Sequence, residues 1–482
     1  MHVLIVVPAR GGSKGLPGKN LKPVAGVSLV GRAVIAGREF AQRAGINATV
    51  FVDTDSQDIA DEGRRYGAVV PFLRPAELAV DTTSTSDSVL HAVSRFEAAG
   101  TPADAIVLLQ PTSPLRVAED IVRCWAAFDA ESAPSVISTM PVGHPPELSL
   151  RTEANGVVNW ALGEPPADTR RQAFRPSVLP NGAVYVLTLE LLRRERRFIV
   201  PGVTRAVLMP PERSVDIDTA ADLAQAEALA TQAAVRPVAI GPMTVARDQC
   251  RIIADAGDVA AADAAIVRVL VDSAADAGAD AIRLFLSEPT AVGLANLHDA
   301  RQHAALRGLA VIATAGDQPM LERLDEIGVD AFHVVLGNAG ANAILARAAR
   351  AARPILISTG AATFEVIVDA MMAVRGGGDV SVALLHGASP GCTGPLHCNL
   401  RVMDSLRALF GVPVGWGDET SGSDIALAAV ACGAALLETR QTGHHLTALV
   451  SSVRSVRAAL GDGVKALPWR AGGSSEPRHV HE

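Results

Sequence analysis

The second half of the chain repeats one pattern eight times, and this repetition constrains the fold more than any other feature. Between residues 251 and 465, short apolar runs alternate with alanine-rich helical segments in units of about 20 to 30 residues. The expected strands are RIIADA (251–256), AIRLFL (281–286), LAVIAT (309–314), AFHVVL (331–336), PILIST (354–359), SVALLH (381–386), VPVGWG (412–417) and ALLETR (435–440). Eight strand–helix units predict a (β/α)8 TIM barrel.

The first 228 residues alternate strands and helices less regularly. Apolar runs at 3–8, 49–54, 105–110, 135–140 and 183–188 are separated by helical patterns, and the helical segment DLAQAEALATQAA closes the region. This alternation predicts a Rossmann-like, doubly wound α/β domain with a parallel or mixed sheet. Such sheets bind their ligands at the carboxyl ends of the strands.

The composition excludes several function classes. The chain has 482 residues, of which 49% are hydrophobic and 20% are charged, and its formal net charge is −8. An acidic chain is a poor general surface for nucleic acid, and no apolar run approaches the ~20 residues of a membrane span, so we expect neither partner. The five cysteines (Cys124, Cys250, Cys392, Cys398 and Cys432) form no C-x-x-C pair. Their scatter indicates a reducing, cytoplasmic location.

A glycine-rich loop with three cations follows the first apolar run. The stretch ARGGSKGLPGKN (9–20) holds Arg10, Lys14 and Lys19 among four glycines. Asn20 after Gly18-Lys19 rules out a Walker A loop, and no G-x-G-x-x-G triplet is present. Glycines still let backbone N–H groups turn inward around an anion, while the cations neutralise its charge. We interpret the loop as a polyphosphate site, with a turn of solvated lysines as the alternative.

Two carboxylates stand close together in SVDIDT (214–219). Asp216 and Asp218 are two residues apart in a stretch that looks extended, so we expect their side chains to share one face. Two carboxylates on one face are costly unless a cation joins them, and Mg²⁺ takes carboxylate and phosphate oxygens together. The pattern indicates a magnesium site. A helix N-cap is the alternative, because a helical segment follows Asp218 directly.

Five motifs of this region form a linked set. They are PARGGSKGLPGKNL (8–21), LRPAELAVDTTST (73–85), LLQPTSPLR (108–116), RQAFRP with LPNGAVY (171–185) and SVDIDT. In this order and spacing, residues 1–228 resemble the acylneuraminate (CMP-sialic acid) cytidylyltransferases. The resemblance implies a nucleotide-diphospho-sugar transferase fold, Mg²⁺ as cofactor and a homodimer. It also implies that the α-phosphate of CTP is joined to the anomeric hydroxyl of a nonulosonic acid, with release of pyrophosphate.

The resemblance also gives roles to the matched residues. Arg10, Lys14 and Lys19 would hold the triphosphate and stabilise the leaving pyrophosphate. Asp216 and Asp218 would bind the metal, and one of them can help to deprotonate the attacking hydroxyl. The expected substrate-binding residues are Ser13, Asn20, Arg74, Gln110, Thr112, Ser113, Arg171 and Asn181.

Two of these residues would recognise opposite ends of the substrates. Arg74 would meet the cytidine, and Arg171 would pair with the carboxylate of the sugar acid. The family places a further arginine where this chain has Leu179, and Arg175 is the candidate substitute.

Residues 236–465 resemble the sialic acid synthases, which condense phosphoenolpyruvate with an N-acyl hexosamine. The likeness begins at RPVAIGPMTVARDQCRIIADAG and continues through RPILISTGAAT, LLHGASP, VPVGWGDETSG and ALLETRQT. The residues expected at the barrel mouth are Asp255, Arg283, Ser358, His386, Glu419 and Glu438.

The barrel departs from that family where the chemistry is done. Arg283 and His333 replace two lysines, Glu419 replaces a metal histidine, and Asp258-Val-Ala-Ala stands in place of Asn-His-Asn-Gly. His386 matches the other metal histidine and could share a divalent metal with Glu419, although a hydrogen-bonded histidine is the alternative. We therefore expect that the barrel no longer performs the condensation. The roles that stay open for it are catalysis, ligand sensing and a platform for dimerisation.

These observations divide the chain and set its candidate functions. We expect a cytidylyltransferase domain at 1–228, a linker with a hairpin at 229–250, the divergent barrel at 251–467 and a disordered tail at 468–482. The expected function is transfer of the cytidylyl group of CTP to a sialic-type sugar acid. The alternatives are transfer to 3-deoxy-manno-octulosonate or a phosphonate, a bifunctional enzyme whose barrel still condenses, and a non-catalytic scaffold.

Overall fold

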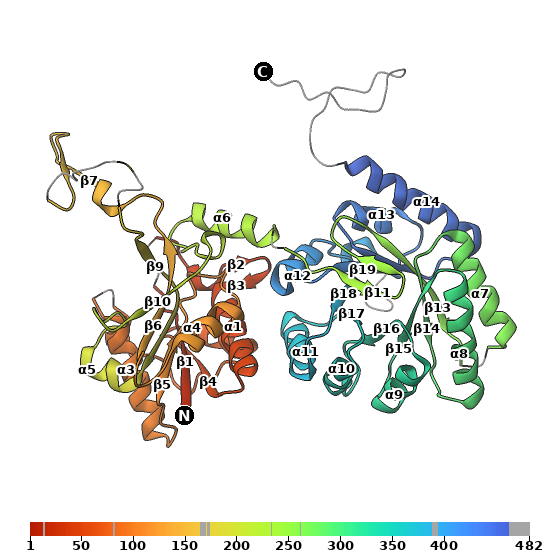
Figure 1. Cartoon of the computed structure of the whole chain (residues 1–482), viewed down its shortest axis with the longest axis horizontal. Coiled ribbons are helices and arrows are strands. Elements are labelled where there is room, and N and C mark those ends of the chain that lie inside the picture. Colours follow the sequence, from red (N-terminus) through yellow and green to blue (C-terminus); the bar gives the residue numbers. More distant parts are fainter. Residues whose placement is uncertain are drawn as a thin grey trace.

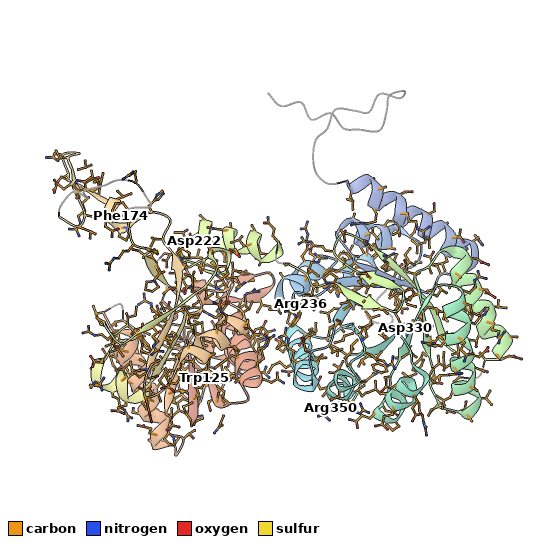
Figure 2. The ribbon with its side chains drawn as sticks, viewed as in Figure 1. Trp125, Phe174, Asp222, Arg236, Asp330 and Arg350 are labelled. Carbon is orange, nitrogen blue, oxygen red and sulfur yellow. The ribbon has the colours of Figure 1, made fainter. Side chains whose placement is uncertain are left out.

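The computed structural model describes residues 1–12, 15–80, 82–163, 170, 174–232, 234–260, 262–387 and 394–461. Two α/β units lie side by side, and the chain passes from one to the other near Arg236 (Figures 1 and 2). The expected tail at 468–482 lies outside the described residues, and the domain boundaries drawn from the sequence stay predictions.

The N-terminal unit contains a six-stranded mixed sheet in the order β10-β6-β9-β5-β1-β4. Its strands are β1 (His2–Pro8), β4 (Asn47–Asp53), β5 (Ala105–Leu108), β6 (Ser135–Pro141), β9 (Val178–Thr188) and β10 (Arg205–Leu208). Only β9 runs antiparallel to its neighbours, β5 and β6. The mixed α/β fold expected from the sequence is confirmed, with β10 as an edge strand that the apolar pattern did not predict.

Helices cover both faces of this sheet because its central strands are apolar on both sides. In β1, Val3, Ile5 and Val7 pack with α1 (Leu29–Ala44), α2 (Gln57–Arg65) and α4 (Ala118–Ala127). Leu4 and Val6 pack on the other side with α3 (Thr85–Ala98) and α5 (Leu189–Glu195). Burial on both faces is the signature of a central parallel strand.

Two small pairs of strands lie outside the sheet. The first, β2 (Pro23–Val24) with β3 (Val27–Ser28), links the one-turn helix η1 (Lys19–Leu21) to α1. The second, β7 (Leu150–Thr152) with β8 (Val158–Trp160), is a hairpin that projects away from the sheet (Figure 1). Neither was predicted, because strands of two or three residues leave no readable alternation.

The C-terminal unit is a closed barrel of eight parallel strands, as the sequence predicts. The strands are β13 (Arg251–Asp258), β14 (Ala281–Phe285), β15 (Ala310–Thr314), β16 (Ala331–Val335), β17 (Ile355–Ser358), β18 (Val382–Gly387), β19 (Val414–Asp418) and β20 (Leu436–Thr439). Closure comes from the pairing of β13 with β20.

Eight helices and one hairpin complete the described part of the barrel. The helices are α7 (Ala264–Ala277), α8 (Ala291–Leu306), α9 (Gln318–Ile327), α10 (Ala341–Arg350), α11 (Phe364–Gly377), α12 (Val402–Phe410), α13 (Asp424–Ala431) and α14 (Gly443–Leu460). The hairpin of β11 (Val238–Ile240) and β12 (Met243–Val245) packs against the first residues of several barrel strands. It therefore closes the end of the barrel opposite the mouth.

Candidate active site

A pocket of about 630 Å³ opens at the carboxyl edge of the N-terminal sheet. Strands β1 and β5 lead directly into it, since Pro8 ends β1 and Gln110 follows β5. The residues that line it are Pro8, Arg10, Gly15, Lys19, Asn20, Arg74, Leu78, Val80, Thr83, Ser84, Thr85, Ser88, Gln110, Pro111, Thr112, Asp218 and Thr219. Seven of the predicted site residues thus meet in one cavity: Arg10, Lys19, Asn20, Arg74, Gln110, Thr112 and Asp218.

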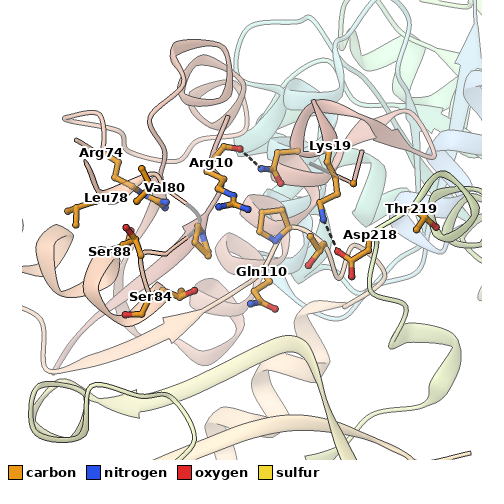
Figure 3. Close-up of a pocket in the computed structure, with 17 residues that line it drawn as sticks. Arg10, Lys19, Arg74, Leu78, Val80, Ser84, Ser88, Gln110, Asp218 and Thr219 are labelled. Carbon is orange, nitrogen blue, oxygen red and sulfur yellow. Dashed lines mark hydrogen bonds and ion pairs between the residues drawn. The ribbon is translucent and has the colours of Figure 1, made fainter. Parts of the chain in front are cut away.

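The glycine-rich loop folds against the segment that carries the two aspartates. The Nζ of Lys19 donates to the carbonyl of Ile217 at 2.7 Å and lies 3.1 Å from Oδ1 of Asp218 (Figure 3). A Cβ on Gly15 would lie 2.7 Å from the carbonyl oxygen of Asp218, so only glycine permits this approach. The contact between Lys19 and Asp218 joins residues 199 positions apart in the chain.

Asn20 orders the start of the same loop from inside. It is buried, and its Nδ2 donates to the carbonyl of Arg10 at 3.0 Å, as Figure 3 also shows. The Arg10 side chain lies in the middle of the pocket, between Lys19 and Arg74. The predicted polyphosphate loop therefore presents its described cations toward one space.

The two aspartates occupy different positions around Lys19. Asp218 lines the pocket with a side chain that is 76% exposed, whereas the Lys19 side chain is only 14% exposed. Burial raises the pKa of Asp216 above its ordinary value, and the negative charge of Asp218 raises it further, while a hydrogen bond with Thr112 lowers it. The charge of Asp218 thus disfavours ionisation of Asp216, and a bound cation would relieve that repulsion.

The helix-cap alternative for Asp218 is wrong. The N-cap of α6 (Ala220–Thr231) is Thr219, whose side chain accepts from the Asp222 amide. Asp222 completes the cap by accepting from the amide of Thr219 at 2.8 Å. The helix start is therefore satisfied without the carboxylate of Asp218, which contacts Lys19 instead.

The far end of the pocket rests on a buried ion pair. The Nη2 of Arg74 donates to Oδ2 of Asp53 at 2.7 Å and to the carbonyl of Asp53 at 2.8 Å. Ser88 donates to the same carboxylate. Asp53 is fully buried at the end of β4. The pair fixes the orientation of Arg74, which reaches the pocket at its edge.

Hydroxyl groups that the sequence analysis did not single out also line this end. Thr83, Ser84, Thr85 and Ser88 come from the start of α3. Their signal lay within the motif LRPAELAVDTTST, but Ser84 also serves as the helix N-cap, accepting from Asp87. A Ser/Thr-rich helix start looks the same in a sequence whether or not it faces a ligand.

Two predicted substrate-binding residues lie behind the pocket. Ser113 and Asn181 are buried and are absent from its described lining; Ser113 Oγ donates to the carbonyl of Asn181 at 3.0 Å. The Asn181 side chain bonds Ser138 Oγ at 2.6 Å and Ser214 Oγ at 2.9 Å. In the structure they hold the pocket wall together, and a direct contact with substrate stays a prediction.

The remaining predicted residues of this domain lie either outside the described part of the chain or at its surface. Ser13, Lys14 and Arg171 lie outside the described residues. Leu179, where the resembled family has an arginine, lies on β9 with 48% of its surface exposed. Arg175, the candidate substitute, is exposed on the segment before β9.

The barrel mouth holds a network of charged side chains that pair with one another. Arg283 Nη2 lies 2.5 Å from Oδ2 of Asp255, and its Nε lies 3.1 Å from Oε2 of Glu438. Arg440 contacts the same oxygen of Asp255 at 3.0 Å and Glu419 at 3.5 Å. Burial raises the pKa of Glu438 to about 7, although the Arg283 guanidinium opposes that shift. Four of the expected mouth residues, Asp255, Arg283, Glu419 and Glu438, are therefore linked through ion pairs with Arg283 and Arg440.

The histidines of the barrel are also engaged. His333 is buried, and its ring nitrogens lie 2.9 Å from Thr314 Oγ1 and 2.7 Å from Ser358 Oγ. The Nε2 of His386 must donate to the carbonyl of Cys398 at 2.9 Å, because a carbonyl can only accept. Burial lowers the pKa of both histidines.

No group of three potential metal ligands (His, Cys, Asp or Glu) occurs among the described residues. A His386–Glu419 metal site in the barrel stays a prediction. Likewise, none of the described helices is both long and apolar enough to cross a membrane.

Comparisons with known proteins divide the chain as the two folds do. The family model described as "Cytidylyltransferase" matches residues 4–158, and the "NeuB family" model matches residues 288–465. A CMP-N,N'-diacetyllegionaminic acid synthase from Legionella pneumophila is 32% identical over 232 residues, which are 48% of this chain and 96% of that protein.

Further relatives match the same half. A pseudaminic acid cytidylyltransferase from Campylobacter jejuni is 26% identical over 48% of this chain and 96% of its own length. An N-acylneuraminate cytidylyltransferase from Streptococcus agalactiae is 31% identical over 46% of this chain. The matched segment covers 52% of that protein's length. Among solved structures, a sialic acid synthetase from Leptospira borgpetersenii is 23% identical, with a TM-score of 0.44 over 49% of this chain and 93% of that one.

Proposed function

We propose, from the premise that the chain belongs to the cytidylyltransferase family, that it joins CTP to a nonulosonic acid and releases pyrophosphate. The observation that carries the proposal is the meeting of Lys19 and Asp218, 3.1 Å apart, at the edge of a pocket of about 630 Å³. A cation beside an exposed carboxylate at a strand-edge pocket suits a phosphate chain and its metal.

The described cations account for the leaving-group half of the reaction. In cytidylyl transfer, the anomeric oxygen of the sugar acid forms a bond to the α-phosphorus of CTP. The bond from that phosphorus to the bridging oxygen breaks, and pyrophosphate leaves with the electron pair. Arg10 and Lys19 line the space where this negative charge would develop, so they would stabilise it without reorganisation. Lys14 and Ser13 would add to the same cradle.

The carboxylates would serve the metal and the proton. Asp216 and Asp218 offer the hard oxygen ligands that Mg²⁺ takes, and the raised pKa of Asp216 fits a pair that a cation would stabilise. Mg²⁺, when bound there, would neutralise charge on the phosphate oxygens. One of the two carboxylates would also help to deprotonate the anomeric hydroxyl.

Arg74, Gln110, Thr112 and the hydroxyls at the start of α3 would orient the nucleoside and the sugar acid. Arg171 would pair with the acid's carboxylate. We favour a nonulosonic acid as the acceptor because three relatives are named for legionaminic, N-acylneuraminic and pseudaminic acids. The apolar, exposed Leu179 keeps another acceptor, octulosonate or a phosphonate, as the second candidate.

We further propose a homodimer and a cytoplasmic location. The β7–β8 hairpin and the strand β9 expose apolar side chains, among them Leu150, Val158 and Leu179, which a second copy of the chain could cover. The four described cysteines are all unpaired, as they would be in a reducing compartment.

For the barrel, we propose that it does not condense phosphoenolpyruvate with a sugar. Its mouth carboxylates pair with Arg283 and Arg440, and His333 and His386 bond to groups within the barrel. A steady release of phosphate from phosphoenolpyruvate in the presence of an N-acyl hexosamine and Mn²⁺ would contradict this and support the bifunctional alternative.

The test of the main proposal is pyrophosphate release by the full chain with CTP and Mg²⁺. The acceptors are a panel of nonulosonic acids, 3-deoxy-manno-octulosonate and simple phosphonates, and ATP and UTP serve as nucleotide controls. CTP-dependent release with a nonulosonic acid is expected. Release with octulosonate or a phosphonate alone would support the second candidate, and no release with bound CTP would contradict the proposed acceptor class.

A further inference from the structure

The barrel contacts the cytidylyltransferase unit through α11, which meets α1, and α12, which meets α6 (Figure 1). Helix α1 meets α11 through an ion pair between Glu39 and Arg375 and another between Arg38 and Asp369 at 3.0 Å. Gln42 adds a hydrogen bond to the carbonyl of Met372 at 2.8 Å. A contiguous apolar core runs through both units. The two units are therefore joined by ion pairs, a hydrogen bond and apolar packing as well as by the chain itself.

The barrel also touches the turn that follows the phosphate loop. Gly26, in the β2–β3 turn, has φ of +76°, and a Cβ there would lie 2.7 Å from Ser405 Oγ of α12. Phe364 of α11 lies 3.4 Å from the same position. The turn comes only a few residues after Lys19, and the amide of Leu29 bonds back to the carbonyl of Lys22 at 3.1 Å. The barrel thus braces the backbone just beyond the helix η1.

A small apolar cluster connects the barrel to both sides of the site. Its buried residues include Ile217, between the two aspartates, and Ala226 of α6, and Leu16 of the glycine-rich loop packs against them. Ala408 of α12 packs against this same cluster. The carbonyl of Leu16 accepts from the amide of Lys19 at 3.1 Å. The loop that carries the lysine and the segment that carries the carboxylates therefore rest on one patch that the barrel completes.

We propose that the barrel is a positioning domain for cytidylyl transfer: α11 and α12 hold the Lys19 loop and the Asp216–Asp218 segment in fixed relation. The inference rests on the proposed function of the pocket. It gives the barrel a role that needs none of its mouth residues. Because transition-state stabilisation depends on placement within fractions of an ångström, loosening this packing should lower kcat more than it raises KM for CTP.

The first experiment places a charge in the shared cluster of the full chain. Ala408→Glu would put a carboxylate against this apolar cluster, and Ala343→Glu, at an exposed position of α10, is the matched control. We expect Ala408→Glu to lower kcat about tenfold or more, with KM for CTP changed less than about threefold. The Mg²⁺ concentration for half-maximal rate should also rise, while the control matches the unmodified protein in all three.

The second experiment remains decisive if Ala408→Glu fails to fold. Glu39→Arg and Arg375→Glu each break the ion pair at the α1–α11 contact, and the double swap restores it with reversed polarity. Each single variant should lower kcat, and the double variant should recover at least about half of the loss, because residues in contact couple. A role limited to stability would lower the unfolding temperature of the single variants without this pattern in kcat.

The outcomes separate the inference from the function on which it rests. If the unmodified chain releases no pyrophosphate with any acceptor, the proposed function has failed. If it is active and every folded interface variant keeps its kcat and Mg²⁺ requirement, the positioning role is overturned. Loss of kcat in the single variants with recovery in the double swap supports it.

Discussion

Replacing Lys19 with alanine tests the proposed chemistry most directly. The lysine is largely buried, at 14% exposure, and its Nζ lies at the edge of the pocket beside Asp218. A cation about 4 Å from a phosphate oxygen interacts with it by about 4 kcal/mol at an effective dielectric constant of ~20. Loss of one preorganised donor typically costs about 2.7–4 kcal/mol, or roughly 10²–10³ in rate. We therefore expect kcat to fall by about a hundredfold or more.

The same substitution should cost little stability. The partner carboxylate of Asp218 is 76% exposed, so the ion pair is screened by water and contributes at most about 1 kcal/mol. In a unit of about 230 residues, that shifts the unfolding temperature by about 2–4 °C. The assay is steady-state pyrophosphate release with a thermal melt of each variant.

Lys22→Ala is the matched control, because Lys22 follows the same one-turn helix but does not line the pocket. It should leave kcat within about twofold of the unmodified chain. A Lys19→Ala protein that melts normally and turns over at the unmodified rate would remove this loop from the mechanism.

Three further results are expected. Asp218→Asn should raise the Mg²⁺ concentration needed for half-maximal activity, because it removes a ligand charge; an unchanged titration would argue against metal binding there. Thr219→Ala should lower the free energy of unfolding by about 1 kcal/mol, since it removes the N-cap of α6, yet leave the Mg²⁺ titration as it was; a shifted titration would mean that cap and metal site are one. The pKa of Glu438 is raised to about 7 by burial, so the folded state holds its proton where the unfolded chain releases it. Stability should therefore fall as pH rises from about 4.5 to 7, and Glu438→Gln should flatten that slope in urea melts at several pH values; parallel slopes would contradict the shift.

Local periodicity was enough to predict most of the fold. The eight barrel strands are short, mainly apolar runs that are buried on both faces. Their short length and the helical patterns between them identify them as strands. The edge strand β10 escaped notice because most of its residues are exposed, including Leu208 at 49%. The β7–β8 hairpin was missed because its strands have three residues each, too few to show alternation, and most of them are exposed.

The candidate site was predictable only in part. Cations clustered within twelve residues can be read directly from the loop, and so can two aspartates two residues apart. The hydroxyls of α3 could not be told from a helix cap. Asn181 is a predicted substrate ligand, and only the structure shows that its side chain bonds Ser138 and Ser214 inside the wall; its contact with substrate stays a prediction.

What the residues establish by themselves is chemistry and local form: which segments are strands, where cations gather, and which carboxylates can share a metal. Contacts between segments that are distant in the sequence are determined by the tertiary structure. Only the folded chain brings Lys19 to Asp218, turns Arg283 of the barrel mouth toward Asp255, and seats Ala408 of α12 against the cluster beneath the site. The physical reason is that such contacts depend on how whole elements pack, and packing is a property of surfaces that no short stretch of sequence contains.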